Sequence, residues 1–207
     1  KKLISDIVNV TSKAAISCYK FIGKKDKNSA DKAATDSMRN EINKLKISGE
    51  VVIGEGELDE APMLYIGEKL GSGGSLELDI AVDPLEGTNL AAKNLPGALS
   101  VISVAEKGNL FNAPETYMDK LAVSGKVPLD ATDLDFPLEK NVKNIADTMN
   151  KDIKDINVCL LNRPRHQKII DQLNDMSVNM KLLSDGDVSG ALMVTNEKYN
   201  IDMFIGI

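Results

Sequence analysis

The sequence has 207 residues, of which 43% are hydrophobic and 27% are charged, a composition typical of globular rather than disordered proteins. This length suits one large domain or two small ones, and either can bury a hydrophobic core. A formal net charge of −6 argues against nucleic acid or an anionic membrane as the main partner. No apolar run approaches the roughly 20 residues that cross a bilayer. Charges also interrupt the N-terminal segment, so we expect a cytoplasmic protein without a secretory signal.

Two helices are predicted at the N-terminus. In the first, which we expect to end before Gly23, apolar residues recur at three- and four-residue steps: Leu3, Ile4, Ile7, Val8, Ala14, Ala15 and Cys18. A polar loop that includes Lys27 leads to a second helix, whose predicted buried stripe is Ala34, Met38, Ile42 and Leu45. Asp31 is predicted in the first turn of this helix, where an acid suits the helix macrodipole. That structural role and a functional one both stay open for Asp31.

An acidic loop follows a predicted strand at Val51–Gly54. It carries four acids in six residues, Glu55, Glu57, Asp59 and Glu60, and such like-charge density costs stability unless a positive charge lies among them. We predict a helix at Ala61–Leu70 after the loop, which makes the loop a strand-to-helix connection of the kind that collects ligand sites. Glu55 is then a candidate ligand, and Asp59 is a candidate base or an acid that supports the ligands from behind. Glu57 and Glu60 are interpreted as surface or helix-start charges, and a solvated acidic loop is the alternative for the whole segment. A glycine-rich linker, Gly71–Ser75, leads to the next strand.

The central motif is Leu78–Asn89. Leu78–Val82 has the pattern of a buried strand, which we expect to end at Asp83 because Pro84 lacks a backbone donor. Asp83 and Glu86 would then form a carboxylate cradle for a hard cation such as Mg²⁺. The N–H groups and hydroxyl of Gly87-Thr88-Asn89 would bind a phosphate beside it. The alternative is an acidic surface turn that caps the next helix.

The middle of the chain sets the expected domain boundary. Leu99–Ala105 is another predicted strand, and Tyr117 is either a ligand-contacting residue or a half-buried packing residue. Turn residues and few periodic apolar residues mark Val123–Asp135, so we expect two domains, residues 1–126 and 127–207. Cys18 and Cys159 lie far apart without metal-ligand spacing, which predicts free buried thiols.

The second half predicts a helix over Leu138–Met149, a strand at Val158–Leu161, a further helix, and a last strand from Ile201. Arg163 and Arg165 flank Pro164 at the end of the first of these strands, and two guanidinium groups make a strong anion site. His166 is interpreted as a plain helix-start residue and not as a catalytic one. Asp185-Gly186-Asp187 places two acids after a strand, without the later ligands of an EF-hand.

The motifs resemble a known family. Asp-Pro-Leu-Glu-Gly-Thr at 83–88 resembles the signature of the lithium-sensitive, Mg²⁺-dependent phosphatase superfamily. The stretches 52–64 and 112–118 narrow the resemblance to the class II, GlpX-type fructose-1,6-bisphosphatases of bacteria. This resemblance implies a layered α/β sugar-phosphatase fold with mixed sheets, flanking helices and two αβ subdomains.

The resemblance also implies a set of site residues. Two or more divalent ions, Mn²⁺ or Mg²⁺, would lie roughly 4 Å apart on the implied metal ligands Asp31, Glu55, Asp83 and Glu86. Thr88 and Asp59 would orient and activate the attacking water. The implied substrate contacts are Lys27, Glu86, Gly87, Thr88, Tyr117, Arg163, Pro164, Arg165, Asp185, Gly186 and Asp187.

The implied activity is hydrolysis of the 1-phosphate of fructose-1,6-bisphosphate to fructose-6-phosphate, in gluconeogenesis and glycerol metabolism. The implied protein is a homo-oligomer, dimer or tetramer, with no nucleic-acid or membrane partner. Alternatives are a sedoheptulose-1,7-bisphosphatase, an inositol-type monophosphatase, or a metal- and sugar-phosphate-binding module without turnover. The last is weighed because family members continue past Gly206-Ile207, and that continuation carries a further acidic ligand.

Overall fold

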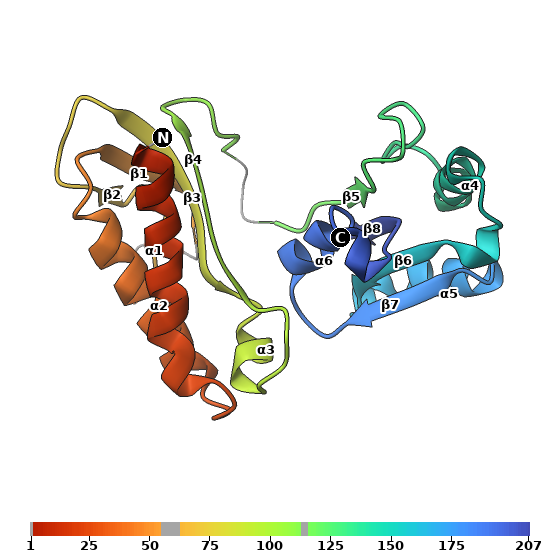
Figure 1. The fold of residues 1–207 in the computed structure, drawn as a ribbon, viewed down its shortest axis with the longest axis horizontal. Coiled ribbons are helices and arrows are strands. Elements are labelled where there is room, and N and C mark those ends of the chain that lie inside the picture. The colour runs from red at the N-terminus through yellow and green to blue at the C-terminus, as the bar shows by residue number, and fades with distance from the viewer. Residues whose placement is uncertain (1, 55–62, 113–115) are drawn as a thin grey trace. The chain divides into compact units, whose positions relative to one another are not determined.

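The computed structural model describes residues 2–54, 63–112 and 116–207. The chain divides into two compact units, residues 1–116 and 117–207. Each is an α/β unit with a four-stranded mixed sheet and flanking helices (Figure 1). The boundary expected between residues 126 and 127 lies after β5 (Lys120–Val123), whereas β5 pairs with β8 (Met203–Gly206) inside the second unit.

The first unit packs two helices against one face of its sheet. Its elements are α1 (Lys2–Cys18), η1 (Tyr19–Phe21), α2 (Lys27–Ile42), β1 (Ser48–Ile53), β2 (Lys69–Leu70), β3 (Glu77–Glu86), α3 (Thr88–Ala92) and β4 (Leu99–Glu106). The strand order is β2-β1-β3-β4, with β1 and β3 parallel and the other two pairs antiparallel. Side chains of α1, α2, β1 and β3 form one core, among them Val10, Met38, Val51 and Ile80.

α1 forms where it was predicted, but its buried face is narrower than the sequence pattern suggested. Val10, Ala14 and Cys18 are buried, whereas Ile4, Val8 and Ala15 are exposed. The predicted helix is thus confirmed, but these three apolar residues of its pattern are not part of the core. The helix is apolar over more than one face, and only one face meets α2 and the sheet.

α2 begins earlier than predicted because it is capped by a residue that the sequence analysis did not consider. The carboxylate of Asp26 accepts a hydrogen bond from the Ser29 N–H (3.0 Å), which makes Asp26 the N-cap and Lys27 the first helical residue. Asp31 thus lies beyond the first turn, and its predicted position there is wrong. The macrodipole explanation for this acid falls away, because the effect is confined to the first turn.

β3 does not end at Asp83, as predicted from Pro84, but continues to Glu86. The register against β4 shifts between Asp83 and Glu86, which marks a bulge. A bulge lets a strand carry a proline because the missing N–H falls where the ladder is already interrupted. The two acids therefore belong to one bulged strand end rather than to a turn after it.

The helix predicted at Ala61–Leu70 is also wrong over its described part. From Met63 onward the chain is non-helical, and it ends in β2, which pairs antiparallel with β1. Gly67 adopts a φ of +90°, and its N–H donates to the Val51 carbonyl (2.7 Å). Pairing along β1 has overridden a weak helical pattern.

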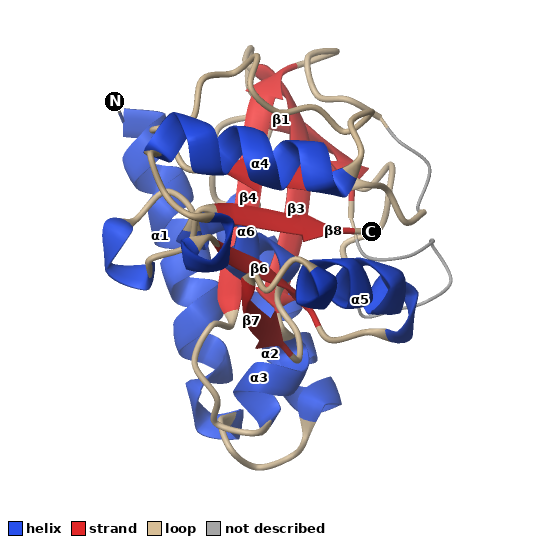
Figure 2. Cartoon of the chain, turned by 90° about the vertical axis from the view of Figure 1, so that its right-hand side faces the viewer, coloured by secondary structure: helices blue, strands red, loops and turns tan. Residues whose placement is uncertain are grey.

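The second unit places helices on both faces of its sheet (Figure 2). It contains β5, α4 (Leu138–Met149), η2 (Ile153–Asp155), β6 (Asn157–Leu161), η3 (Pro164–His166), α5 (Gln167–Asp175), β7 (Asn179–Leu183), α6 (Asp187–Met193), η4 (Glu197–Tyr199) and β8. The strand order is β5-β8-β6-β7. Val158 and Leu160 of β6 pack with α4 and α5, whereas Cys159 faces the cluster on the α6 side.

Several predictions from the sequence are confirmed here. The helix at Leu138–Met149 and the strand at Val158–Leu161 are present, and both cysteines are free and buried.

Among the described residues, no helix is long and apolar enough to span a bilayer.

Candidate metal and phosphate sites

Two acids of the central motif lie at the bulged end of β3. Glu86 is only 7% exposed, and Asp83 is half-buried. The bulge at Pro84 lets Asp83 and Glu86 leave the regular ladder together. Carboxylates held this far from water need hydrogen bonds, a cation or a metal ion to offset the lost hydration.

Asp31 reaches the same unit from α2, a helix that packs against β3 and α3. Its Oδ1 is buried and has no hydrogen-bond partner among the residues that the structure describes. Burial raises the pKa of the Asp31 carboxyl above its ordinary value. An orphaned buried carboxylate oxygen fits a hard cation such as Mg²⁺ or Mn²⁺, which prefers oxygen ligands.

The full predicted ligand set is not assembled by the described residues alone. Within them, no three His, Cys, Asp or Glu side chains are grouped so that they could hold a metal ion. Glu55, the fourth predicted ligand, and Asp59, the predicted base, lie outside the described residues. The metal site therefore stays a prediction, which the orphaned oxygen of Asp31 supports.

Gly87 and Thr88 join the strand end to α3. Gly87 has a φ of +76°, and a Cβ there would lie 3.1 Å from Leu90 Cδ1, so only glycine fits without strain. The Thr88 hydroxyl donates to the Leu85 carbonyl (3.0 Å). Because its proton is engaged there, the Thr88 oxygen is available to accept a hydrogen bond from a water molecule.

An ion pair that the sequence analysis missed holds the segment after the acidic loop. Arg39 of α2 donates to both carboxylate oxygens of Glu68 (2.7 and 3.1 Å) and to the Met63 carbonyl (2.6 Å). The paired carboxylate raises the pKa of the Arg39 guanidinium. These bonds anchor residues 63–68 to α2. Arg39 meets these partners only in the folded chain, so the local sequence does not reveal them.

Lys27, a predicted phosphate contact, lies exposed at the start of α2.

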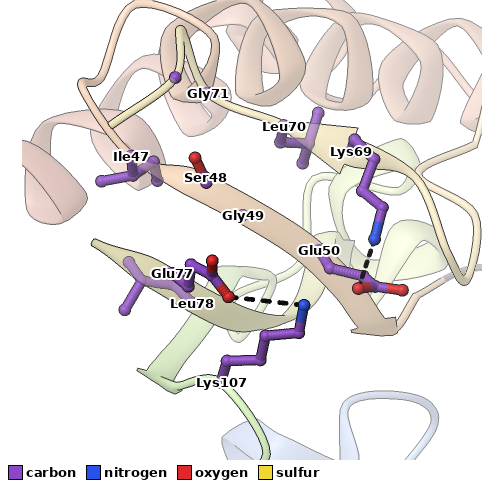
Figure 3. Close-up of a pocket in the computed structure, with 11 residues that line it drawn as sticks. Ile47, Ser48, Gly49, Glu50, Lys69, Leu70, Gly71, Glu77, Leu78 and Lys107 are labelled. Carbon is purple, nitrogen blue, oxygen red and sulfur yellow. Dashed lines mark ion pairs between the residues drawn. The ribbon is translucent and has the colours of Figure 1, made fainter. Parts of the chain in front are cut away.

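A hollow of about 360 Å³ lies at the opposite end of the same strands, lined by the starts of β1 and β3 (Figure 3). Both lysines in it are paired, Lys69 with Glu50 and Lys107 with Glu77 (3.5 Å). Because both lysines of this hollow are already paired with carboxylates, the hollow is a weak candidate for an anion site. The end of β3 is the better candidate for a ligand site, and its ligand would be a cation.

In the second unit, the predicted anion-binding arginine lies at the ends of two parallel strands. The Asn162 N–H donates to the Leu183 carbonyl (2.7 Å), which brings the ends of β6 and β7 together. Arg163 follows β6 and Asp185 follows β7, and they form an ion pair (3.1 Å). The carboxyl ends of parallel strands are where open α/β sheets bind ligands.

Arg165 is held by a contact that the sequence pattern did not reveal. Its Nε donates to the Ile207 carbonyl (2.8 Å), and its guanidinium lies 4.4 Å from the centre of the Tyr117 ring, a cation–π geometry. Tyr117 is 71% exposed, so the half-buried packing role is wrong. Pro164, between the arginines, begins η3, where its missing N–H costs nothing.

His166 is more than a helix-start residue, although the prediction that it is not catalytic still stands as a prediction. It is fully buried; its Nδ1 lies 2.8 Å from the Leu161 carbonyl, and its Nε2 accepts from the Ile207 N–H (2.9 Å). A neutral ring protonated on Nδ1 satisfies both bonds. His166 thereby fixes the Ile207 peptide, to which Arg165 is bonded.

The remaining predicted residues of this unit lie at the start of α6. Gly186 is the N-cap, with a φ of +96°, and Asp187 forms an ion pair with Lys120 of β5 (3.2 Å). Lys120 was not predicted, because only the fold brings it to Asp187. With Arg163, Arg165 and Lys120 against Asp185 and Asp187, the group carries three positive and two negative charges, so an anionic ligand would balance it.

A mixed α/β fold with a candidate cation site and a candidate anion site is the pairing expected of a metal-assisted phosphoester hydrolase. The family model described as bacterial fructose-1,6-bisphosphatase, glpX-encoded, matches residues 1–207. The chain therefore belongs to that family, which confirms the resemblance found in the motifs.

Individual proteins that resemble the chain agree with this family assignment. The chain is 42% identical over its whole length to fructose-1,6-bisphosphatase 1 class 2 of Escherichia coli K12 and covers 61% of that protein. It is 40% identical to the class 2 enzyme of Haemophilus influenzae and covers 62% of it. It is also 40% identical to a D-fructose 1,6-bisphosphatase class 2/sedoheptulose 1,7-bisphosphatase of Synechococcus sp. strain JA-2-3B'a(2-13), again with 62% coverage. The chain thus spans about three fifths of the length of these relatives.

Proposed function

We propose that the chain hydrolyses the 1-phosphate of fructose-1,6-bisphosphate to fructose-6-phosphate and phosphate, with Mn²⁺ or Mg²⁺, as a step of gluconeogenesis. The observation that carries this proposal is the buried Oδ1 of Asp31, which has no hydrogen-bond partner among the described residues, in a chain of the fructose-1,6-bisphosphatase family. Buried free thiols at Cys18 and Cys159 suit a reducing compartment, so we place the protein in the cytoplasm.

In this proposal the first unit binds the cation and the reacting phosphate. Asp31, Asp83 and Glu86, with Glu55 outside the described residues, would hold the ions. Divalent ions held there would supply positive charge against the phosphate and make an attacking water more acidic. Three carboxylates without such an ion would repel the anionic substrate, which is why the activity should depend on added metal.

Thr88 would position the water for in-line attack. Its hydroxyl proton is committed to the Leu85 carbonyl, so its oxygen would accept a hydrogen bond from the water and fix the direction of a lone pair. Asp59 would take the proton released by the water. Gly87, which leaves no side chain at the α3 start, would let the phosphate approach the backbone closely. No covalent phosphoenzyme is required.

The second unit would bind the other end of the sugar. Arg163 and Arg165 would contact the phosphate that is not cleaved, since guanidinium groups bind phosphate oxygens in pairs. Asp185 and Asp187 would accept hydrogen bonds from sugar hydroxyls, and Tyr117 would contact the substrate beside Arg165.

The test is phosphate release from fructose-1,6-bisphosphate by the 207-residue chain, with Mn²⁺, with Mg²⁺ and with a chelator. We expect metal-dependent release that Asp83→Ala lowers by about a hundredfold to a thousandfold, the scale of losing one group that stabilises charge in the transition state. Glu77→Ala is the matched control, because it removes an acid from the exposed start of the same strand. Equal loss in both variants would contradict the proposed role of Asp83.

If the chain releases no phosphate, a measurement of substrate binding decides between two conclusions. If the chain binds fructose-1,6-bisphosphate with metal but releases no phosphate, the alternative of a binding module without turnover holds for these residues. If it neither binds nor releases, the site assignment is wrong.

A second candidate activity is hydrolysis of sedoheptulose-1,7-bisphosphate, because the Synechococcus relative carries both names. A substrate panel with fructose-1,6-bisphosphate, sedoheptulose-1,7-bisphosphate and inositol-1-phosphate separates these activities. We expect the two sugar bisphosphates to be the better substrates, since inositol-1-phosphate lacks the second phosphate that Arg163 and Arg165 would bind. Preferential turnover of inositol-1-phosphate would contradict the role given to the arginines.

A further inference from the structure

His166 lies where two strands of the second unit end, and its ring joins them. Its Nδ1 lies 2.8 Å from the Leu161 carbonyl at the end of β6, and its Nε2 accepts from the Ile207 N–H (2.9 Å) directly after β8. The backbone N–H of His166 donates to the Arg163 carbonyl (2.9 Å). Because the ring is fully buried, the protein rather than water satisfies both of its nitrogens. His166 thus ties the turn that carries the two arginines to the end of β8.

Arg165 differs from the other two cations of the candidate anion site in its partners. Those two are each paired with an acid, whereas no carboxylate among the described residues pairs with Arg165. Its Nε donates to the Ile207 carbonyl (2.8 Å), and its guanidinium lies 4.4 Å from the centre of the Tyr117 ring. Both of these partners are neutral. The positive charge of Arg165 therefore stays available to a phosphate, which a guanidinium binds through paired hydrogen bonds.

Ile207 links the histidine to the arginine. Its N–H and its carbonyl flank one α-carbon; His166 holds the N–H, and Arg165 Nε bonds to the carbonyl. A free arginine side chain samples many rotamers, and fixing it on a ligand costs conformational entropy. Arg165 avoids part of that cost only while Ile207 stays in place. The hydrogen bond from Ile207 to His166 keeps it there.

We propose that His166 is a positioning residue for sugar-phosphate binding, because its neutral ring fixes Ile207 and so holds Arg165 ready for the phosphate that is not cleaved. This inference rests on the proposed function, in which Arg165 contacts that phosphate. His166 is fully buried and acts through Arg165, so it is not a catalytic residue. The role requires the uncharged ring with its proton on Nδ1, since a protonated Nε2 could not accept from the Ile207 N–H.

Two substitutions of His166 each keep one half of the ring. The side-chain oxygen of glutamine can take the place of Nε2, whereas the amide nitrogen of asparagine can take only that of Nδ1. His166→Gln therefore keeps an acceptor for the Ile207 N–H, and His166→Asn does not. The Leu161 carbonyl stays satisfied in both variants, because it also accepts from the Arg163 N–H (3.1 Å).

Calorimetric titration of the 207-residue chain with fructose-1,6-bisphosphate and a chelator compares these variants. We expect His166→Asn to weaken binding by about tenfold, the scale of one lost hydrogen bond. His166→Gln should stay within about twofold of the wild type. Melting curves check that each variant is folded.

A second pair of variants leaves the buried ring intact. Ile207→Pro removes the same N–H from its other end and should weaken binding as much as His166→Asn does. Ile207→Ala keeps both the N–H and the carbonyl and should bind like the wild type. If His166→Asn does not fold, Ile207→Pro carries the test.

A double-mutant cycle with Arg165→Lys tests whether His166 acts through Arg165. Adding His166→Asn to Arg165→Lys should weaken binding by less than about twofold further, because the group that His166 positions is already gone. A second tenfold loss in that background, about the loss seen in the wild type, would show that His166 supports the fold in general. That result overturns the proposal.

Exchange of the Arg165 Nε–H, followed by heteronuclear NMR, reports the positioning without any substrate. It should be slow in the wild type and His166→Gln, and at least about tenfold faster in His166→Asn and Ile207→Pro. Unchanged exchange or unchanged affinity in these two variants overturns the inference and leaves the proposed function standing. If Arg165→Lys binds fructose-1,6-bisphosphate as tightly as the wild type, the role given to Arg165 in the proposed function is wrong, and the inference falls with it.

Discussion

The acids of the two units are satisfied in different ways. In the second unit, Asp185 pairs with Arg163 and Asp187 with Lys120, so each acid has a cation from its own chain. In the first unit, Asp31 keeps a buried oxygen without a hydrogen-bond partner among the described residues. Asp187 also keeps a buried Oδ1 without a hydrogen-bond partner among the described residues, but its Oδ2 is paired with Lys120. The difference supports the proposal that the first unit uses a cation from solution where the second unit uses cations of its own chain.

The largest change in the free energy of unfolding should come from breaking the ion pair of Lys151 and Asp202 in the second unit. Buried Asp202 accepts from Lys151 Nζ (2.7 and 2.9 Å) and from the Asn157 N–H (2.9 Å). Lys151→Met leaves that carboxylate buried without its cation and should lower the free energy of unfolding by about 3 kcal/mol. Urea denaturation measures the loss. Lys126→Met, which breaks the exposed pair with Glu197, should leave it almost unchanged, because water and salt screen that pair; equal losses would contradict the distinction.

A somewhat smaller effect is expected for the ligand contacts of the second unit. Arg165→Lys removes the planar group that lies over Tyr117 and bonds to Ile207. We expect fructose-1,6-bisphosphate binding to weaken by about 2 kcal/mol, roughly thirtyfold, the scale of hydrogen bonds to a charged group. Calorimetric titration measures the affinity. Lys168→Ala removes a charge from exposed α5 sequence and serves as the control; an equal loss there would mean that net charge alone binds the sugar phosphate.

In the first unit, removing a buried acid should raise the free energy of unfolding instead of lowering it. Asp31→Asn removes an incompletely satisfied buried charge and should stabilise the metal-free chain by about 1 kcal/mol. The same variant should lose most of the rise in melting temperature that Mn²⁺ gives the wild type, because fewer ligands remain. Asp36→Asn, which alters exposed pairs with Lys32 and Arg39 on the same helix, should not stabilise. A destabilising Asp31→Asn would mean that the carboxylate is already satisfied without metal.

The smallest effect concerns pH. Burial raises the pKa of the Cys159 thiol from 9.0 to about 11. Between these values the unfolded chain loses the thiol proton while the folded chain keeps it, so stability is retained below pH 9 and falls as pH rises toward 11. We expect Cys159 to contribute a loss of about 0.5–1 kcal/mol between pH 9 and pH 10. The slope should be shallower in Cys159→Ala; an unchanged slope would show that other groups cause it.

The sequence predicted the elements whose pattern is local. The stripe of α4, the stripe of α2 as far as Ile42 and the apolar run of β6 are set by side-chain periodicity, which needs no knowledge of the rest of the chain. Leu45, also predicted in the α2 stripe, lies beyond the end of that helix and is only partly buried. α1 shows the limit, because periodicity cannot tell which of two apolar faces meets the core. The extension of β3 through Pro84 was missed because the bulge depends on its pairing with β4.

The sequence offered the residue types of the candidate site, which stay a prediction, but not the contacts that these residues make in the structure. Arg163 and Arg165 were identified from chemistry and spacing, whereas the roles of His166 and Lys120 rest on contacts with Ile207 and Asp187. Those contacts join positions distant in sequence, and no local signal announces them. The one signal that the sequence offers for His166 is a weak one, namely that it is the single histidine of the chain.

Hydrogen exchange of the 207-residue chain, resolved by segment, tests most directly whether the first unit binds the metal and the second unit binds the sugar phosphate. Mn²⁺ alone should slow exchange in α2 and around 83–92, and leave the second unit unchanged. Fructose-1,6-bisphosphate with chelator should slow exchange around 163–167 and 185–189 instead. If Mn²⁺ protects the second unit, or protects the first equally well in Asp83→Ala, the proposal that the first unit binds the metal and the second unit pairs its acids with its own cations is wrong.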